Sequence, residues 1–153
     1  MLKTPRNKKI LTWLLLAGSV LVLIGLVVYF YFATLTHGDT AKMKVDFSVD
    51  AIPFIKEFEK DYKAANKKYA EKIIAVKGII TSAEAADTTI NIKMADTTTG
   101  SYLIFAFQDQ HLNEAKALKA GDHVTIKGSC SDGVYSEILG TYFISFKRST
   151  VEH

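Results

Sequence analysis

The chain has 153 residues, of which 48% are hydrophobic and 23% are charged, and its formal net charge is +3. Because 4 of its 19 basic residues precede position 10, the rest of the chain holds 15 basic and 16 acidic residues. This near balance argues against a nucleic-acid-binding surface, which normally carries an excess of Lys and Arg. The single cysteine, Cys130, excludes an intramolecular disulfide, and the four scattered histidines lack the spacing of a zinc site.

The first predicted element is an uncharged apolar stretch, residues 10–36, which we expect to be a single-pass transmembrane helix. About 20 apolar residues are enough to cross roughly 30 Å of hydrocarbon. Trp13 near the start and Tyr29 and Tyr31 near the end are typical of membrane interfaces. The alternative is a cleaved secretory signal, but the apolar core is too long for one and ends in bulky aromatic residues.

The residues on either side of this helix predict its orientation. The tail, residues 1–9, is basic, whereas the flank after the helix is neutral overall. Since cationic segments stay in the cytoplasm, we expect a cytoplasmic N-terminus and a C-terminal domain outside. We therefore predict an uncleaved signal anchor.

Residues 37–47 are predicted to form a short polar linker, and residues 48–72 a helix. Ser48 or Asp50 can cap this helix, and Pro53 is tolerated in its first turn. Apolar residues recur at steps of three or four, namely Ile52, Ile55, Phe58, Tyr62, Ala65 and Tyr69. This pattern favours packing on a core, and the alternative is a docking face for a partner helix.

After residue 72 the apolar period changes from 3.6 to 2, which indicates strands. The predicted strands are 72–85, 88–95, 101–107, 122–129 and 134–148, with a short helix at 108–121 and turns at 86–87, 96–100 and 131–133. Five short antiparallel strands with a helix between the third and fourth are typical of an OB-fold, a small, partly open barrel. The predicted domain is therefore 48–148, and residues 149–153 are a C-terminal tail.

Two sequence patterns resemble a known family. They are A-x-K-K-Y-x-x-K-x-I-x-V-x-G-I-I, from Ala65 to Ile80, and L-K-A-G-D-H-V-T-I-K-G-S-C at 118–130. Both are similar to the tRNA-anticodon-binding-like OB-fold family, mostly uncharacterised bacterial envelope proteins, many of them lipoproteins. The resemblance covers about residues 50–147 and implies a location at the bacterial inner (cytoplasmic) membrane, with the domain periplasmic or extracellular. It implies no catalytic residue, and this chain has a transmembrane helix in place of a lipidated cysteine.

OB-folds bind ligands on strands 2–3 and on the loops that join strands 1–2 and 4–5. The candidate ligand-binding residues are Asn91, Lys93, Tyr102, Phe105, Phe107 and Tyr135, the last within the segment Ser131–Ser136. The alternative is that the aromatic side chains simply fill the barrel.

These observations favour a membrane-anchored binding or accessory module that engages a protein partner or a larger inner-membrane complex. The alternatives are binding of single-stranded nucleic acid, which the charge balance disfavours, binding of an oligosaccharide by the OB-fold face, and a purely structural role. No G-x-S-x-G, H-E-x-x-H, P-loop or G-x-G-x-x-G motif occurs, so we predict no enzymatic activity. We also predict no cofactor and no metal.

Overall fold

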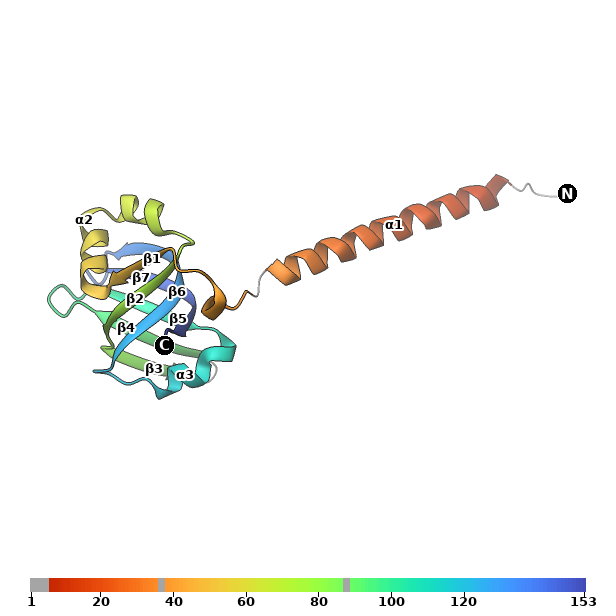
Figure 1. Cartoon of the computed structure of the whole chain (residues 1–153). Helices are drawn as coiled ribbons and strands as arrows, with labels where there is room; N and C mark the ends of the chain where they lie inside the picture. The colour runs from red at the N-terminus through yellow and green to blue at the C-terminus, as the bar shows by residue number, and fades with distance from the viewer. Residues whose placement is uncertain (1–5, 36–37, 87–88) are drawn as a thin grey trace. The chain divides into compact units, whose positions relative to one another are not determined.

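The computed structural model describes residues 6–35, 38–86 and 89–153, and the chain divides into two units that meet between Gly38 and Asp39. The first unit is the helix α1, Arg6–Leu35 (Figure 1). Its segment Ile10–Phe32 is long and apolar enough to cross a membrane, and its side chains are exposed all round. This confirms the predicted helix where it is described; a signal sequence near the N-terminus can meet the same criterion of length and composition. Some predictions fall on residues that the structure does not describe. These are residues 1–5 of the predicted tail, residues 36–37 after α1, and residue 87 of the predicted turn.

The second unit is β-rich and carries two α-helices and two short 3-10 turns (Figure 1). Its elements are η1 Thr40–Lys42, β1 Phe47–Asp50, α2 Ala51–Tyr69, β2 Ile73–Ile79, β3 Ser82–Ala86, β4 Thr89–Ala95, β5 Tyr102–Phe107, η2 Asp109–His111, α3 Leu112–Ala117, β6 His123–Ser136 and β7 Thr141–Val151.

The strands form one seven-stranded sheet in the order β1-β2-β6-β7-β5-β4-β3. The pairs β1/β2 and β5/β7 are parallel, and the other pairs are antiparallel. The prediction of five antiparallel strands in a barrel is therefore wrong in strand count, and this sheet is not closed.

The extra strands have two physical causes. Residues 47–50, predicted as linker and helix start, pair with β2 instead, so the helix begins only at Ala51. The predicted strand 72–85 changes partner at its middle, because the Ile80 amide donates to the Asp122 carbonyl and the Thr81 amide donates to the Lys93 carbonyl. Its two halves, β2 and β3, therefore lie in different parts of the sheet.

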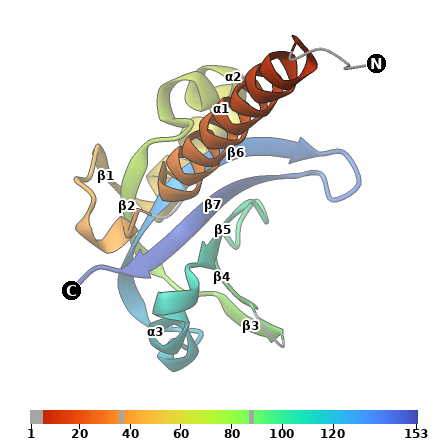
Figure 2. The ribbon, with the colours of Figure 1, turned by 90° about the vertical axis from the view of Figure 1, so that its right-hand side faces the viewer.

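The predicted turn at 131–133 is also wrong, because β6 continues to Ser136 through two shifts of register. Gly133 is buried beneath α2, where a Cβ would overlap the Phe58 ring, so this glycine serves packing and does not make a turn. The turn that joins β6 to β7 instead contains Gly140, whose φ is +65°. Figure 2 shows the long β6–β7 hairpin that results.

The predicted tail 149–153 is wrong at its start, since β7 runs to Val151 and both Ser149 and Thr150 are buried. The helix predicted at 108–121 is shorter in the structure. It consists of the 3-10 turn η2 followed by α3, which ends at Ala117.

The helix α2 packs an apolar face on the sheet, as the sequence predicts, but Ile52 of the predicted face is 44% exposed. Phe54 and Phe58 are buried, and the Phe54 ring lies 6.0 Å from that of Phe146 in β7. Backbone angles at Asp61 are not helical, and its carboxylate accepts a hydrogen bond from the Ala64 amide. Asp61 thereby caps the second half of α2 at a kink.

Candidate binding face

The strands β4, β5 and β7 present alternate side chains to the two faces of the sheet. One set is buried in the core and consists of Ile90, Ile92, Met94, Leu103, Phe105, Ile144 and Phe146. The other set faces outward and is partly exposed; it includes Asn91, Lys93, Tyr102, Ile104, Phe143 and Ser145. We call this second set the outer face.

Two aromatic side chains stack at the centre of the outer face. Tyr102 and Phe143 are directly opposite each other in the parallel pair β5/β7, and their rings lie 6.1 Å apart at 21°. Both are only partly buried, so the pair offers an aromatic surface to solvent. Such a surface can stack a flat or ring-shaped ligand or pack against a partner protein.

The only predicted cation of this face is already paired. The Lys93 Nζ lies 5.6 Å from the Tyr102 ring centroid and 2.9 Å from the Glu84 carboxylate of β3. Because Glu84 offsets the charge of Lys93, the outer face has little positive charge with which to attract a phosphate backbone. Asn91 lies beside Glu84 in the β3/β4 pairing.

The other predicted aromatic residues do not join this surface. Phe105 is fully buried and stacks on Phe146 at 4.8 Å, so it belongs to the core. Phe107 follows an irregularity in the β5/β7 register and packs, half-buried, against the core. For these two residues the structure matches the alternative that aromatic side chains fill the domain.

Tyr135 lies on β6, opposite Tyr142 of β7, with ring centroids 4.9 Å apart. Tyr142 in turn contacts Tyr62 of α2 at 5.9 Å. Alternation along the strand places Tyr135 on the other side of the hairpin from Val134, which pairs with Phe143. The predicted site residues are therefore split between two faces.

The tip of the β6–β7 hairpin is a feature that the sequence reasoning missed. Ile138 is 96% exposed and Leu139 is 62% exposed, although both are large and apolar. Val134 and Tyr135, just before the tip, are also exposed. We call these four residues the hairpin patch. The sequence signal is an apolar pair beside Gly140, within the predicted strand 134–148.

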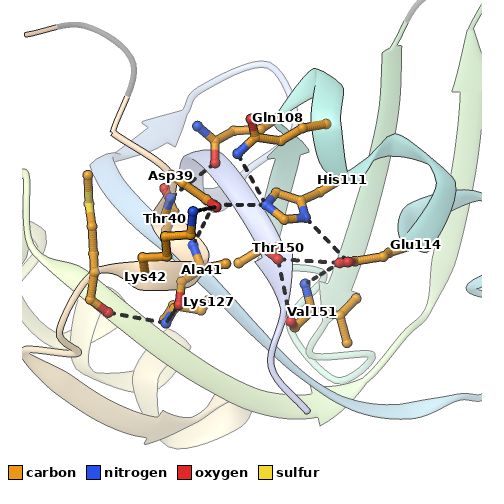
Figure 3. Close-up of polar contacts among 12 residues, drawn as sticks. Asp39, Thr40, Ala41, Lys42, Gln108, His111, Glu114, Lys127, Thr150 and Val151 are labelled. Carbon is orange, nitrogen blue, oxygen red and sulfur yellow. Dashed lines mark hydrogen bonds and ion pairs between the residues drawn. The ribbon is translucent and has the colours of Figure 1, made fainter. Parts of the chain in front are cut away.

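A second missed feature fastens the segment after α1 to the domain (Figure 3). The His111 ring lies between two carboxylates, with Nε2 3.0 Å from Asp39 and Nδ1 3.3 Å from Glu114. The second Glu114 oxygen accepts bonds from the Thr150 hydroxyl and the Val151 amide. Asp39 comes from the predicted linker and His111 from η2, so no linear spacing connects them.

Two further residues hold the same segment. The buried Lys127 Nζ donates to the carbonyls of Ala41, at 2.8 Å, and Met43, at 3.2 Å. The Gln108 side-chain oxygen accepts a bond from the Thr40 amide. We call Asp39, His111, Glu114, Lys127 and Gln108 the η1 cluster.

His111 and Asp39 of the η1 cluster stabilise each other's charged forms. Burial alone would lower the pKa of His111, but its hydrogen bonds to Asp39 and Glu114 outweigh burial and raise that pKa above 6.5. The hydrogen bond from His111 is the main reason why the pKa of Asp39 falls below 3.8. Both hydrogen bonds therefore favour the imidazolium form of His111.

The described residues offer no group of three or more His, Cys, Asp or Glu side chains arranged to hold a metal ion. Cys130 is fully buried, and this burial raises the pKa of its thiol to about 12. A thiol with such a pKa is protonated at neutral pH and is a poor nucleophile.

The comparison with family models decides the relationship of this chain. The model of the tRNA_anti-like family matches residues 1–139. The chain belongs to the tRNA_anti-like family. This confirms the resemblance that the two sequence patterns indicated. The tRNA_anti-like family is characterised by an anticodon-binding-like OB-fold and not by a catalytic motif.

A solved structure with a similar fold is consistent with the tRNA_anti-like family. A lipoprotein of Klebsiella pneumoniae, for which nucleic-acid binding has been suggested, is similar with a TM-score of 0.55 and 20% identity over 77% of this chain and 100% of that one. At this identity the likeness shows the fold alone.

Two larger proteins match more weakly. A proposed aspartyl-tRNA synthetase of Leishmania major has a TM-score of 0.45 and 5% identity over 68% of this chain and 20% of that one. An asparaginyl-tRNA synthetase of Pyrococcus horikoshii has a TM-score of 0.37 and 16% identity over 55% of this chain and 20% of that one. A comparison with curated protein sequences finds no match.

Proposed function

We propose that this protein is a membrane-anchored OB-fold binding module that docks a protein partner within a larger complex of the bacterial inner membrane. In this proposal α1 spans the membrane and the β-rich domain lies on the periplasmic side. The observation that carries it is the hairpin patch, where Ile138 and Leu139 project at 96% and 62% exposure. Large apolar side chains that are exposed next to each other, as Ile138 and Leu139 are in the sequence, often mark a site of protein interaction.

The hairpin patch has the composition of an interface core. Burial of a Leu or Ile side chain stabilises by about 1.5–3 kcal/mol, so the two tip residues supply a useful part of an association energy. Tyrosine, such as Tyr135, is enriched among the residues that dominate binding energies. The outer face adjoins the patch through the Val134–Phe143 pair and extends the apolar surface to Tyr102.

Charge also favours a protein partner over a nucleic acid. The chain after the apolar segment has 15 basic and 16 acidic residues, and Lys93 of the outer face is paired with Glu84. A polyanion would therefore meet little net attraction, whereas a mostly apolar protein surface needs none.

The test is purification of the tagged full chain from native membranes in a mild detergent, followed by mass spectrometry. The test variant is Ile138→Ser/Leu139→Ser, and the matched control is Ile52→Ser, which alters an apolar side chain 44% exposed on α2. We expect a fixed set of membrane subunits with the parent chain and the control, and at least a tenfold loss with the hairpin variant. Recovery of the parent chain alone, or equal recovery of subunits with all three chains, contradicts the proposal.

The stacked Tyr102–Phe143 pair supports a second candidate, binding of single-stranded nucleic acid or an oligosaccharide. Stacking of one base on an aromatic ring contributes about 1–3 kcal/mol. The description of the Klebsiella lipoprotein also favours nucleic acid. The test is binding of a fluorescent oligonucleotide to the full chain in lipid nanodiscs, with Tyr102→Ala as the variant. Salt-sensitive binding that Tyr102→Ala weakens at least tenfold supports nucleic-acid binding, and an absence of oligonucleotide binding at low salt contradicts it.

A further inference from the structure

The His111 ring is placed to hold two carboxylates at once (Figure 3). Its two nitrogens lie within hydrogen-bond distance of Asp39 and Glu114, and only 13% of the side chain is exposed. A neutral imidazole has one N–H donor and one acceptor nitrogen, whereas an imidazolium has two donors. Since a carboxylate can only accept, both contacts are satisfied together only when His111 is protonated.

We infer that His111 is a proton-dependent clasp that fastens Asp39, the first residue of the domain, and releases it when the ring loses its proton. The inference goes beyond the proposed function, since it needs no partner. The two arms of the clasp differ in what else holds them. Glu114 keeps its bonds to Thr150 and Val151 whatever the state of His111, so α3 stays in place. Asp39 depends on the ring and on local contacts within η1.

The surrounding charges determine the direction of the switch. Lys42 lies 3.8 Å from Asp39, and Lys127 of β6 binds the carbonyls of Ala41 and Met43, while β7 contributes only neutral groups, Thr150 and Val151. Lys42 attracts the Asp39 carboxylate and Lys127 holds the backbone that follows it, so both contacts favour the fastened segment.

The sign of the pH dependence follows from the two pKa shifts. Because the pKa of His111 is raised above 6.5, its contribution is complete below 6.5 and is lost as the pH rises through the raised value. Because the pKa of Asp39 is lowered below 3.8, its contribution is complete above 3.8 and is lost only as the pH falls through the lowered value. The clasp is thus fully closed between pH 3.8 and 6.5 and opens on the alkaline side.

Opening of the clasp lengthens the chain between α1 and the domain. With Asp39 fastened, four residue steps separate it from Leu35, which span at most about 14 Å. With Asp39 released, the next held residue is Thr40, through Gln108, and five steps span at most about 17 Å. A membrane-anchored domain would gain reach at alkaline pH without any change in its sheet.

The test uses a nitroxide spin label on the full chain in detergent micelles, attached at Gly38→Cys, next to Asp39. The native Cys130 is buried with a thiol pKa of about 12, so it does not compete for the label. We expect the spectrum of an immobilised nitroxide at pH 6 and that of a mobile nitroxide at pH 9. The change from one to the other should be a single transition above pH 6.5.

Two variants make the test specific. With His111→Gln, which cannot become a cation, the label should be mobile at both pH values. The matched control is His123→Gln, which alters an exposed histidine at the start of β6 and should leave the transition unchanged. Circular dichroism of each variant at both pH values separates release of the segment from unfolding of the domain.

A label whose mobility is the same from pH 5 to pH 9 overturns the inference. So does a transition that persists in His111→Gln or disappears in His123→Gln. Neither result depends on whether a partner binds the hairpin patch.

Discussion

At the scale of single residues, this domain uses small and buried side chains where larger ones would not fit. Gly133 sits under the Phe58 ring, and Cys130, three residues earlier on β6, is fully buried. Both lie where β6 shifts its register against β7. A strand segment this closely covered by a helix tolerates few substitutions, because protein interiors are packed to near-crystalline density.

Replacement of Gly133 by alanine should destabilise the domain. A Cβ at this position overlaps Phe58, and over-packing of a core typically costs about 1–3 kcal/mol. Chemical denaturation of the full chain in micelles, followed by the circular dichroism of the domain, measures this. The double variant Gly133→Ala/Phe58→Leu should cost less than the sum of its two single variants. Strict additivity would show that the clash is not the cause.

The thiol of Cys130 should be inert in the folded chain. Its pKa of about 12 leaves almost no thiolate at pH 8, and the side chain is fully buried. We expect no reaction with a disulfide reagent at pH 8 under native conditions and complete reaction within minutes in denaturant. Rapid labelling of the native chain would mean that β6 opens locally near Cys130.

At the scale of elements, α2 is joined to β6 by a specific polar contact as well as by apolar packing. The Asn66 side chain accepts a bond from the Gly133 amide, at 2.6 Å, and donates one to the Gly133 carbonyl, at 2.8 Å. These bonds satisfy backbone groups at the point where the β6/β7 ladder is irregular. Asn66 thus connects α2 to the irregular part of β6.

Substitution Asn66→Ala should therefore lower the free energy of unfolding by about 1–3 kcal/mol, because it leaves two partly buried backbone groups without partners. Asn113→Ala, at an exposed position of α3, is the matched control and should change it by less than about 0.5 kcal/mol. The measurement is the midpoint of denaturation of each full chain. Equal midpoints for the two variants would refute the role assigned to Asn66.

The same elements explain what the sequence could and could not predict. The apolar period of α2 and the alternation of β4 are local signals; the helix and the strand are confirmed, although Ile52 of the predicted helix face is exposed. The pairing change at Ile80–Thr81, the β1 edge strand and the continuation of β6 past Gly133 depend on contacts between distant segments. Periodicity carries no information about such contacts. For this reason the predicted strand 72–85 is two strands in the structure, and the predicted turn 131–133 is part of β6.

The candidate site shows the same limit. Tyr102 and Lys93 lie on the outer face because strand alternation places them there. Phe105 follows the same alternation into the core, and the stacking partner Phe143 was not predicted. The η1 cluster joins residues 72 positions apart, Asp39 and His111, and only the folded chain brings them together.

At the scale of the whole molecule, an apolar helix precedes a small domain with an exposed hairpin, and the function proposed above depends on that helix staying attached. In α1 the described side chains from Ile10 to Phe32 are exposed. Exposure of so many apolar side chains is unfavourable in water and favourable in lipid. Each Leu, Ile, Phe or Val at the centre of such a helix favours insertion by about 0.3–0.6 kcal/mol. An anchor and a cleaved signal would both insert, but only an anchor keeps the domain at the membrane.

We expect the uncleaved 17.0 kDa chain to remain in the membrane pellet after extraction at alkaline pH. In cells whose outer membrane has been opened, added protease should digest the domain and leave α1 protected. Substitution of Arg6, Lys8 and Lys9 by Gln removes most of the positive charge before the helix and should protect a larger fraction of domains, because that charge directs orientation. A shorter chain in the supernatant would identify α1 as a cleaved signal. The domain would then act free of the membrane, and the reach controlled by His111 would have no anchor to act from.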